Sequence, residues 1–505
     1  MNRKTIRILT LLLVAMGLGI GEAKSETVQK VKYMGWDDEQ KKLVEMTTPE
    51  GVDVTVLEGT ETTLGSDGVE TWYVTKSEMA TFSTITLKPG VHIILADGTT
   101  MKVSSGFKRD VVGNDIITIY SQGGTNEGNL TIETTGKGFE ILSGNITING
   151  GIIKIEAGSN GIEASWGDVT FNGGKTEITS SGGNGIEASM GNVTFNGGQV
   201  TVTSTGDNMV GIKAKYGITF GWKNPTDDFI KCSSYKIPES GSVKTADGKS
   251  FAVYDGNDFM CVIGKATKKT FFNNNIGSLS NKTLRPFDGR LVTVGSGKTY
   301  YACNLNSSYK PLGNANVYLV TDITYNQSSK QFEAVLSDAQ PGVVSGVPVI
   351  FGVTSGNLPE SIALENDATV SLSATPSKNF IACNGTKKVS ELLPSGVNFA
   401  DVYFFGLSGN SFKRVLLGSD DVHPAGTCFL FISKDDFNNP PSSAPAGARG
   451  IGIETDGTTS LIGNGQLTTD HAASAQWYSL DGRRLDKAPK AKGVYIRNGK
   501  KLVIK

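Results

Sequence analysis

The 505-residue sequence has few histidines and no surplus of charge of either sign. Its three histidines, His92, His423 and His471, lie far apart in sequence, which argues against a histidine-rich zinc site and a histidine-dependent triad. The 48 lysines and arginines balance 49 aspartates and glutamates. We therefore expect no nucleic-acid partner and no basic membrane-binding surface.

Proline, cysteine pairs and long apolar runs are also scarce. The 16 prolines exclude collagen-like and proline-rich classes. Five cysteines cannot all pair, and no Cys-x-x-Cys occurs. After the first segment no apolar run is long enough for a transmembrane helix. In contrast, 63 glycines accompany many Val, Ile and Thr residues, which indicates turn-rich β structure.

Residues 1–23 have the pattern of a signal peptide. Arg3, Lys4 and Arg7 form a positive start, residues 8–20 are apolar, and small residues follow. We expect this segment to be removed, and the mature chain to be secreted or displayed on the outer cell surface.

A repeat of about 24 residues fills the stretch from Phe139 to Phe220. The phrase Gly-Ile-Glu-Ala-Ser starts at Gly161 and Gly185, and each copy is followed by Val-Thr-Phe-Asn-Gly-Gly. Three short alternating segments per repeat, separated by glycine-rich corners, are typical of a parallel β-helix. We predict an all-β chain with a right-handed parallel β-helix over residues 81–265, preceded by an N-terminal cap segment, residues 24–80.

Stacked repeats place equivalent residues in columns about 4.8 Å apart. Ile148, Phe171, Phe195 and Phe220 should form one inward column, and Asn149, Asn172 and Asn196 a structural asparagine ladder at one corner.

Two outward columns are candidate binding sites. Trp166, Met190 and Tyr216 share one corner position, where exposed rings could stack on the apolar faces of sugars. Glu140, Glu163 and Glu187 share another position, with Lys213 next. Stacked carboxylates repel, which could recruit calcium or sugar hydroxyls; a solvated face relieved by Lys213 is the alternative. Trp222 is expected to cap the core.

The repeats, together with the phrases Ile-Ile-Leu-Ala-Asp-Gly at 93–98 and Phe-Gly-Trp-Lys-Asn at 220–224, resemble a bacterial family of carbohydrate-binding domain-containing β-helix proteins, related in fold to pectate lyases. The resemblance implies binding of a polysaccharide, in some members with calcium. Asn160 and Asn184 stand where calcium-binding members tend to carry aspartate, so we expect no required cofactor and keep calcium as a candidate only.

Catalysis is not expected. A lyase would need an acidic calcium cluster with a neighbouring basic residue, and residues 130–220 contain no arginine. A hydrolase would need neighbouring aspartates, and only Asp168 and Asp207 occur there. We predict a non-catalytic binder of a polysaccharide or host glycan; a structural adhesin that binds protein and a degenerate polysaccharide lyase are the alternatives.

Beyond the repeats, residues 285–435 contain strand-like runs between turn signals and predict an antiparallel β-sandwich stalk. Residues 436–474 are predicted as a linker. In the tail, residues 475–505, Asn498-Gly499 between alternating runs indicates a hairpin. This tail is similar to a type IX secretion C-terminal sorting domain, which implies the outer-membrane secretion machinery as a partner.

Deletion of residues 475–505 should leave the rest of the chain folded but stop its delivery to the cell surface, because the tail is the export address in this interpretation. Cell fractionation and protease treatment of intact cells would locate the protein, and thermal melting would compare the two chains. Undiminished surface display of the shortened chain would contradict the sorting resemblance.

Overall fold

The computed structural model describes residues 26–76, 81–113, 115–222, 224–237, 241–245, 250–263, 279–440 and 450–454, and the backbone of four short strands between 477 and 504. The chain divides into two compact units, the first made of residues 1–291 and 363–366, the second of residues 292–362 and 367–505. The predicted signal peptide, residues 1–23, lies outside the described residues.

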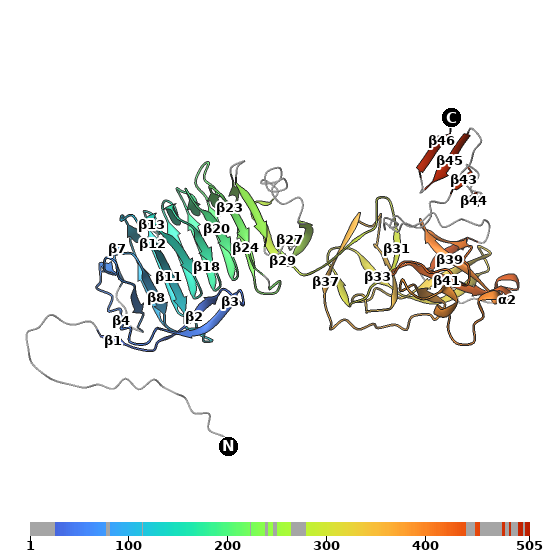
Figure 1. Cartoon of the computed structure of the whole chain (residues 1–505), viewed down its shortest axis with the longest axis horizontal. Coiled ribbons are helices and arrows are strands. Elements are labelled where there is room, and N and C mark those ends of the chain that lie inside the picture. Colours follow the sequence, from blue (N-terminus) through green and yellow to red (C-terminus); the bar gives the residue numbers. More distant parts are fainter. Residues whose placement is uncertain are drawn as a thin grey trace, which may run out of the picture. The chain divides into compact units, whose positions relative to one another are not determined.

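The first unit is a parallel β-helix, as predicted, in which each turn of the chain adds one strand to each of three sheets (Figure 1). The ten-stranded sheet has the order β1 (Thr27–Val28), β4 (Val54–Val56), β6 (Thr71–Val74), β8 (Val91–Leu95), β11 (Ile116–Ser121), β14 (Asn145–Ile148), β17 (Val169–Phe171), β20 (Asn192–Phe195), β23 (Gly217–Phe220) and β26 (Ser242–Thr245). The eight-stranded sheet has the order β25 (Tyr235–Lys236), β22 (Ile212–Ala214), β19 (Ile186–Ala188), β16 (Ile162–Trp166), β13 (Phe139–Ser143), β10 (Phe107–Arg109), β7 (Ile85–Leu87) and β5 (Thr63–Leu64). The nine-stranded sheet has the order β28 (Asp258–Ile263), β27 (Ser250–Asp255), β29 (Thr283–Phe287), β24 (Phe229–Cys232), β21 (Gln199–Ser204), β18 (Lys175–Ser180), β15 (Ile152–Ala157), β12 (Asn129–Thr134) and β9 (Thr100–Val103).

The core of this unit is built from inward columns, because alternate residues of every strand point inside. Ile148, Phe171, Phe195 and Phe220 pair in register on successive turns, which confirms the predicted column. The Phe171 and Phe195 rings stack with centroids 5.3 Å apart. Trp222 is buried beside them, with its ring centroid 4.9 Å from that of Phe220.

The predicted asparagine ladder is present at the corner between the ten-stranded and nine-stranded sheets. Asn172 Nδ2 donates to Asn149 Oδ1 at 2.6 Å, and Asn196 Nδ2 donates to Asn172 Oδ1 at 2.7 Å. The glycines that follow allow the turns to approach closely: a Cβ at Gly174, whose φ is +76°, would lie 2.5 Å from the carbonyl oxygen of Gly151.

Antiparallel strands stand at both ends of the helical stack, and at the N-terminal end β1 pairs antiparallel with β4. Strands β2 (Lys32–Asp37) and β3 (Lys42–Thr47) form a hairpin that lies along the outer side of the stack, where the Tyr33 ring packs on the outward rings of Trp72 and Tyr120, with centroids 5.2 and 4.6 Å away. At the other end, β27, β28 and β29 pair antiparallel, and β29 closes the nine-stranded sheet against β24. Because an open parallel stack would expose backbone groups, such caps are required.

The second unit contains two sheets that pack face to face, as a sandwich predicts. A three-stranded sheet has the order β31 (Tyr300–Asn304), β36 (Pro348–Gly352) and β33 (Asn316–Tyr318). A seven-stranded sheet has the order β34 (Val320–Asn326), β35 (Gln331–Leu336), β42 (Gly450–Glu454), β40 (Ser411–Val415), β39 (Val402–Ser408), β41 (Cys428–Ser433) and β38 (Phe380–Ala382). One core joins them, with Ala302, Tyr318 and Ile350 from the first and Phe332, Phe405 and Leu430 from the second.

Strand β42 lies inside the range predicted as a linker. It pairs antiparallel with β35 and parallel with β40, so the larger sheet is mixed rather than purely antiparallel.

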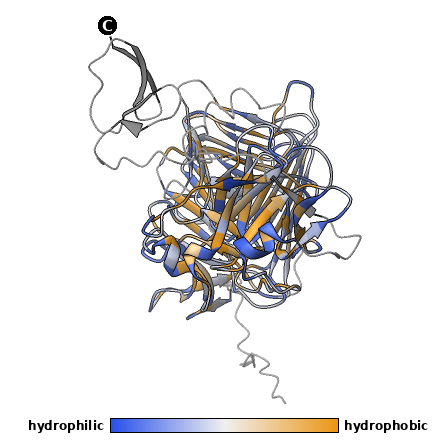
Figure 2. Cartoon of the chain, turned by 90° about the vertical axis from the view of Figure 1, so that its right-hand side faces the viewer, coloured by the Kyte–Doolittle hydropathy of each residue, from blue (hydrophilic) through white to orange (hydrophobic). Residues whose placement is uncertain are grey.

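A further three-stranded sheet has the order β30 (Gly289–Thr293), β37 (Ser361–Asn366) and β32 (Tyr309–Pro311). The short described helices are η2 (Val389–Leu392), η3 (Phe399–Asp401) and α2 (Lys434–Asn438). Hydrophobic and hydrophilic residues alternate along many of the strands (Figure 2).

In the tail, β43 (Trp477–Ser479), β44 (Arg484–Leu485), β45 (Gly493–Arg497) and β46 (Lys500–Ile504) form a four-stranded sheet. Arg497 pairs with Lys500 across β45 and β46, as the hairpin prediction requires, although Asn498 and Gly499 lie outside the described residues. Among the residues whose structure is described, no helix is long and apolar enough to cross a membrane.

Substitution of the buried Phe195 by alanine should lower the free energy of unfolding of the first unit by about 3–5 kcal/mol, because it opens a cavity in the ring column. Urea unfolding followed by the fluorescence of the adjacent Trp222 would measure this loss. Thr194→Ala, which alters the outward neighbour on the same strand, is the matched control and should cost less than about 1 kcal/mol. Equal losses in the two variants would contradict the inward column.

Candidate functional site

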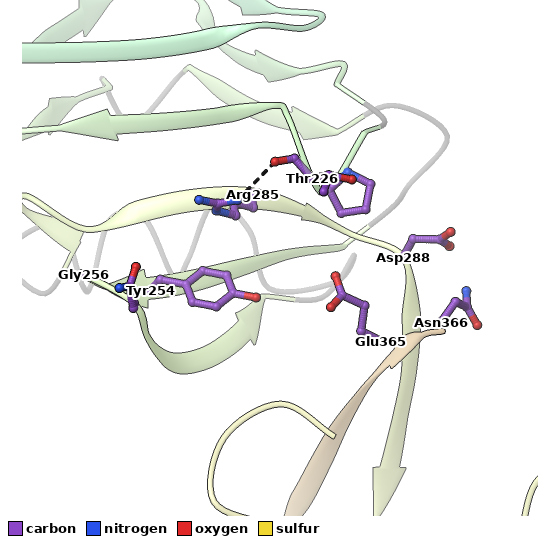
Figure 3. Close-up of a pocket in the computed structure, with 9 residues that line it drawn as sticks. Thr226, Tyr254, Gly256, Arg285, Asp288, Glu365 and Asn366 are labelled. Carbon is purple, nitrogen blue, oxygen red and sulfur yellow. Dashed lines mark hydrogen bonds between the residues drawn. The ribbon is translucent and has the colours of Figure 1, made fainter. Parts of the chain in front are cut away.

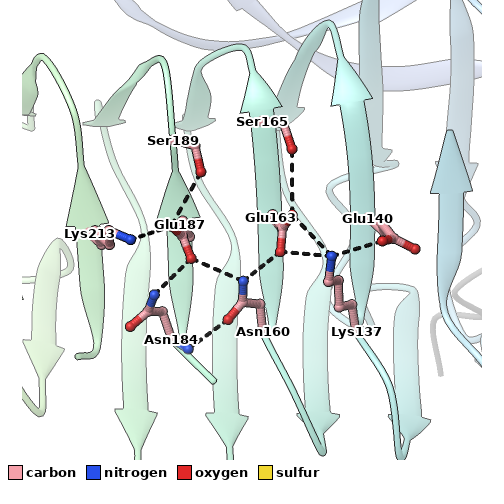
Figure 4. Close-up of polar contacts among 9 residues, drawn as sticks. All are labelled: Lys137, Glu140, Asn160, Glu163, Ser165, Asn184, Glu187, Ser189 and Lys213. Carbon is pink, nitrogen blue, oxygen red and sulfur yellow. Dashed lines mark hydrogen bonds and ion pairs between the residues drawn. The ribbon is translucent and has the colours of Figure 1, made fainter. Parts of the chain in front are cut away.

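The predicted glutamate column lies on the outer face of the eight-stranded sheet. Glu140, Glu163 and Glu187 are the second residues of β13, β16 and β19, and parallel pairing places them opposite one another, with Lys213 of β22 next in line. The alternation of each strand causes this arrangement, because Ile and Ala on either side of the glutamate point into the core. The column is therefore continuous along the helix axis (Figure 4).

Two lysines offset most of the negative charge of the three glutamates. Lys137 Nζ lies between two carboxylates, 2.8 Å from Glu140 and 3.0 Å from Glu163. Lys213 Nζ lies 2.5 Å from Glu187. Burial opposes the charge of Lys137, but the two carboxylates outweigh it and raise the pKa of its ammonium group.

Two corner asparagines complete the network. Asn160 Nδ2 donates to Glu163 at 2.6 Å and to Glu187 at 3.1 Å, and Asn184 Nδ2 donates to Glu187 at 2.8 Å. Their Oδ1 atoms accept from the backbone of the next turn, Asn160 from Asn184 N and Asn184 from Val210 N. Burial of the Glu187 carboxylate favours a higher pKa, but the bonds from Lys213 and Asn184 prevail, and the pKa of Glu187 is lowered.

These contacts bear on the calcium candidates Glu140, Glu163 and Glu187. Across the described part of the chain, no three His, Cys, Asp or Glu side chains form a group that could hold a metal ion. A calcium ion would have to compete with the lysine ammonium groups and with the amide donors of Asn160 and Asn184. An aspartate at those two corners would present only acceptor oxygens, whereas here the Nδ2 donors of Asn160 and Asn184 face the carboxylates and their Oδ1 atoms accept backbone N–H groups.

The predicted aromatic column lies on the edge between the eight-stranded and ten-stranded sheets. Trp166 is 62% exposed, Tyr216 is 48% exposed and Met190 is 37% exposed, so all three side chains face solvent. Backbone bonds keep the corners stacked: Gly144 N donates to Trp166 O, and Tyr216 N donates to Gly191 O, both at 3.1 Å. The structure therefore brings the three predicted residues onto one edge, beside the glutamate column.

The edge contains two further exposed apolar residues that the sequence analysis did not identify. Leu142, one position before the residue that pairs with Trp166, is 39% exposed, and Val112 on the loop between β10 and β11 is 84% exposed. We call the set the apolar ridge: Val112, Leu142, Trp166, Met190 and Tyr216. Alignment of the corners does not find either residue, because Leu142 lies opposite Ser165 rather than Trp166 and the extra loop residues in the turn of Val112 break the alignment.

Two clefts lie elsewhere on the first unit. One, of about 770 Å³, runs between the β2–β3 hairpin and the asparagine-glycine corners and is lined by Trp36, Lys42 and Asn196, among others. The other, of about 430 Å³, includes Arg285 and Tyr254 (Figure 3). Its arginine is already engaged, with the guanidinium carbon 5.5 Å from the Phe229 ring centroid and Nη1 donating to the Thr226 carbonyl.

The first unit is therefore a parallel β-helix that carries a polar face, with paired charges, next to the exposed apolar ridge. Residues 39–266 match the model of a family described as carbohydrate-binding domain-containing protein. The recognition made from the repeats is thereby confirmed over this range. No curated protein and no solved structure matches the chain.

The lowered pKa of Glu187 makes the stability of the first unit dependent on pH. A carboxylate with a lowered folded-state pKa stabilises the fold above its ordinary pKa of 4.5, and this contribution is lost as the pH falls through the folded-state pKa. Glu187→Gln should therefore lose less stability than the unmodified chain when the pH is brought from 7 to below 4. Urea unfolding at both pH values measures the difference. Glu177→Gln, at an exposed position of β18, is the control. An equal loss of stability on acidification in both variants would contradict the role given to Glu187.

Proposed function

We propose that the chain is a non-catalytic carbohydrate-binding protein whose binding surface is the apolar ridge and the adjoining glutamate column. The exposure of Trp166 and Tyr216 on one edge is the observation that supports this most strongly. Rings of this size are normally buried in soluble proteins, and they are suited to the apolar C–H faces of sugars. The neighbouring carboxylates and amides supply hydrogen-bond partners for sugar hydroxyl groups.

The electrostatics of the column favour binding over glycoside hydrolysis. A hydrolase needs one carboxyl group held protonated as the general acid, which requires a raised pKa. The pKa of Glu187 is lowered, and Glu140 and Glu163 share the ammonium group of Lys137. Asp168, one of the two aspartates between residues 130 and 220, accepts two bonds from Asn192 on the next turn.

We further propose that the protein works outside the cytoplasm, secreted or held at the outer cell surface. The signal-peptide pattern of residues 1–23 and the similarity of residues 475–505 to a sorting domain support this location. A protein at this location can reach glycans that lie outside the cell. A glycan array probed with the full mature chain tests the proposal, and binding to none of its sugars, with binding to a protein ligand instead, would favour the adhesin alternative.

Replacement of both Trp166 and Tyr216 by alanine should weaken binding of the array hits at least tenfold, which corresponds to about 1.4 kcal/mol. Aromatic stacking on nucleic-acid bases contributes about 1–3 kcal/mol per ring, and sugars should stack somewhat more weakly. Titration calorimetry measures the affinity. Met260→Ala with Leu291→Ala, which removes two exposed apolar side chains elsewhere, is the control and should bind normally. Unchanged binding by the Trp166/Tyr216 variant would refute the proposed surface.

A further inference from the structure

We propose that the ligand is an uncharged, extended glycan chain that lies parallel to the helix axis, with successive sugars on successive turns of the apolar ridge. This inference rests on the proposed function and specifies the class of its ligand. Its basis is the register of the turns, the extent of the ridge and the charge balance of the face beside it.

The spacing of the ridge side chains is fixed by the strand pairing. Trp166, Met190 and Tyr216 belong to successive turns, and neighbouring strands lie about 4.8 Å apart. This spacing is close to the length of one sugar unit in an extended chain with equatorial linkages at both ends, as in β-1,4-linked glucans, xylans and mannans. A chain laid along the axis therefore meets a side chain of the ridge at each unit, whereas a chain laid across the edge would meet only one.

The ridge continues beyond Trp166 because a loop is fastened to it. Ser143 pairs with Trp166 on the preceding turn and is buried. Its Oγ donates to the Gly113 carbonyl at 2.7 Å and accepts from Gly113 N at 3.2 Å, which sets Val112 above this turn. Arg109, wholly buried, reaches Asp115 at the far end of the same loop.

The ridge thus spans four to five turns. Three to four steps of about 4.8 Å give a length of about 14–19 Å, which accommodates four or five sugars.

The charges of the face favour an uncharged ligand. Four of the cations near the ridge are paired with carboxylates: Lys108 with Asp110, Arg109 with Asp115, Lys137 with Glu140 and Glu163, and Lys213 with Glu187. Among the described residues, the exposed Lys215 beside Tyr216 forms no ion pair, and it adds one positive charge at that end of the ridge. A uronic-acid chain would bring further negative charge to a face that offers little uncompensated positive charge. The amides of Asn160 and Asn184 already occupy the carboxylates through which a bridging cation would have to act.

Calorimetry with the full mature chain tests the inference. The probes are cello-, xylo- and manno-oligosaccharides of two to eight units, and oligogalacturonides of the same lengths, each with and without a chelator. For at least one neutral series we expect affinity to rise up to four or five units and then level off. We expect oligogalacturonides to bind at least tenfold more weakly, and the chelator to have no effect.

Variants at the Val112 end of the ridge test where the bound glycan lies. Leu142→Ala combined with Val112→Ser should weaken binding of a five-unit ligand threefold or more and leave a three-unit ligand unchanged, because the shorter chain can remain on Trp166, Met190 and Tyr216. Ile152→Ala, an exposed residue of the nine-stranded sheet, is the control.

The outcomes separate the two proposals. Affinity that levels off at two or three units, tighter binding of oligogalacturonides, or loss of binding with the chelator would overturn the axial, neutral-chain inference. Binding of array glycans that depends on Trp166 and Tyr216, without binding of any neutral β-1,4-linked series, would overturn the inference and leave the proposed function standing. Array binding that is indifferent to both rings would refute the proposed surface itself.

Discussion

The parallel hydrogen bonding between successive turns is the constraint on which the first unit depends. Because each residue is fixed above its counterpart at about 4.8 Å, each side chain meets the residue at the equivalent position of the next turn, which the repeat often makes the same type. Phenylalanine and asparagine gain from this repetition, as the Phe171–Phe195 stack and the Asn172–Asn149 bond show. Stacked glutamates repel one another, and Lys137 and Lys213 reduce this repulsion by pairing with carboxylates of the column.

This constraint explains which features could be predicted from the sequence. A repeat of 23 or 24 residues determines the register, and the register determines the columns, so the Phe195 column, the asparagine ladder and the exposure of Trp166 follow from the pattern alone. The three-strand turn and the all-β class follow for the same reason. Such predictions are well supported because the same pattern occurs in several successive repeats of the sequence.

The features that were missed are those that occur once. The β2–β3 hairpin lies on the outward rings of Trp72 and Tyr120, a contact between segments with no shared repeat. Strand β42 sits in a range whose composition indicates a linker, although the alternation Gly-Ile-Gly-Ile there is a weak strand signal. The donor role of Asn160 also depends on where its amide points, which spacing does not determine. Non-repeating contacts of this kind depend on tertiary packing.

The asparagines at the corners have a consequence for the chemical ageing of the protein. Asn149, Asn160, Asn172, Asn184 and Asn196 are each followed by glycine. In a flexible chain an Asn-Gly pair readily loses ammonia, because the next backbone nitrogen can attack the side-chain amide. In the folded turns these amides are held in hydrogen bonds and the adjoining backbone is fixed between neighbours. The fraction of each asparagine converted to aspartate would therefore measure how often that turn of the β-helix has opened during the lifetime of the molecule.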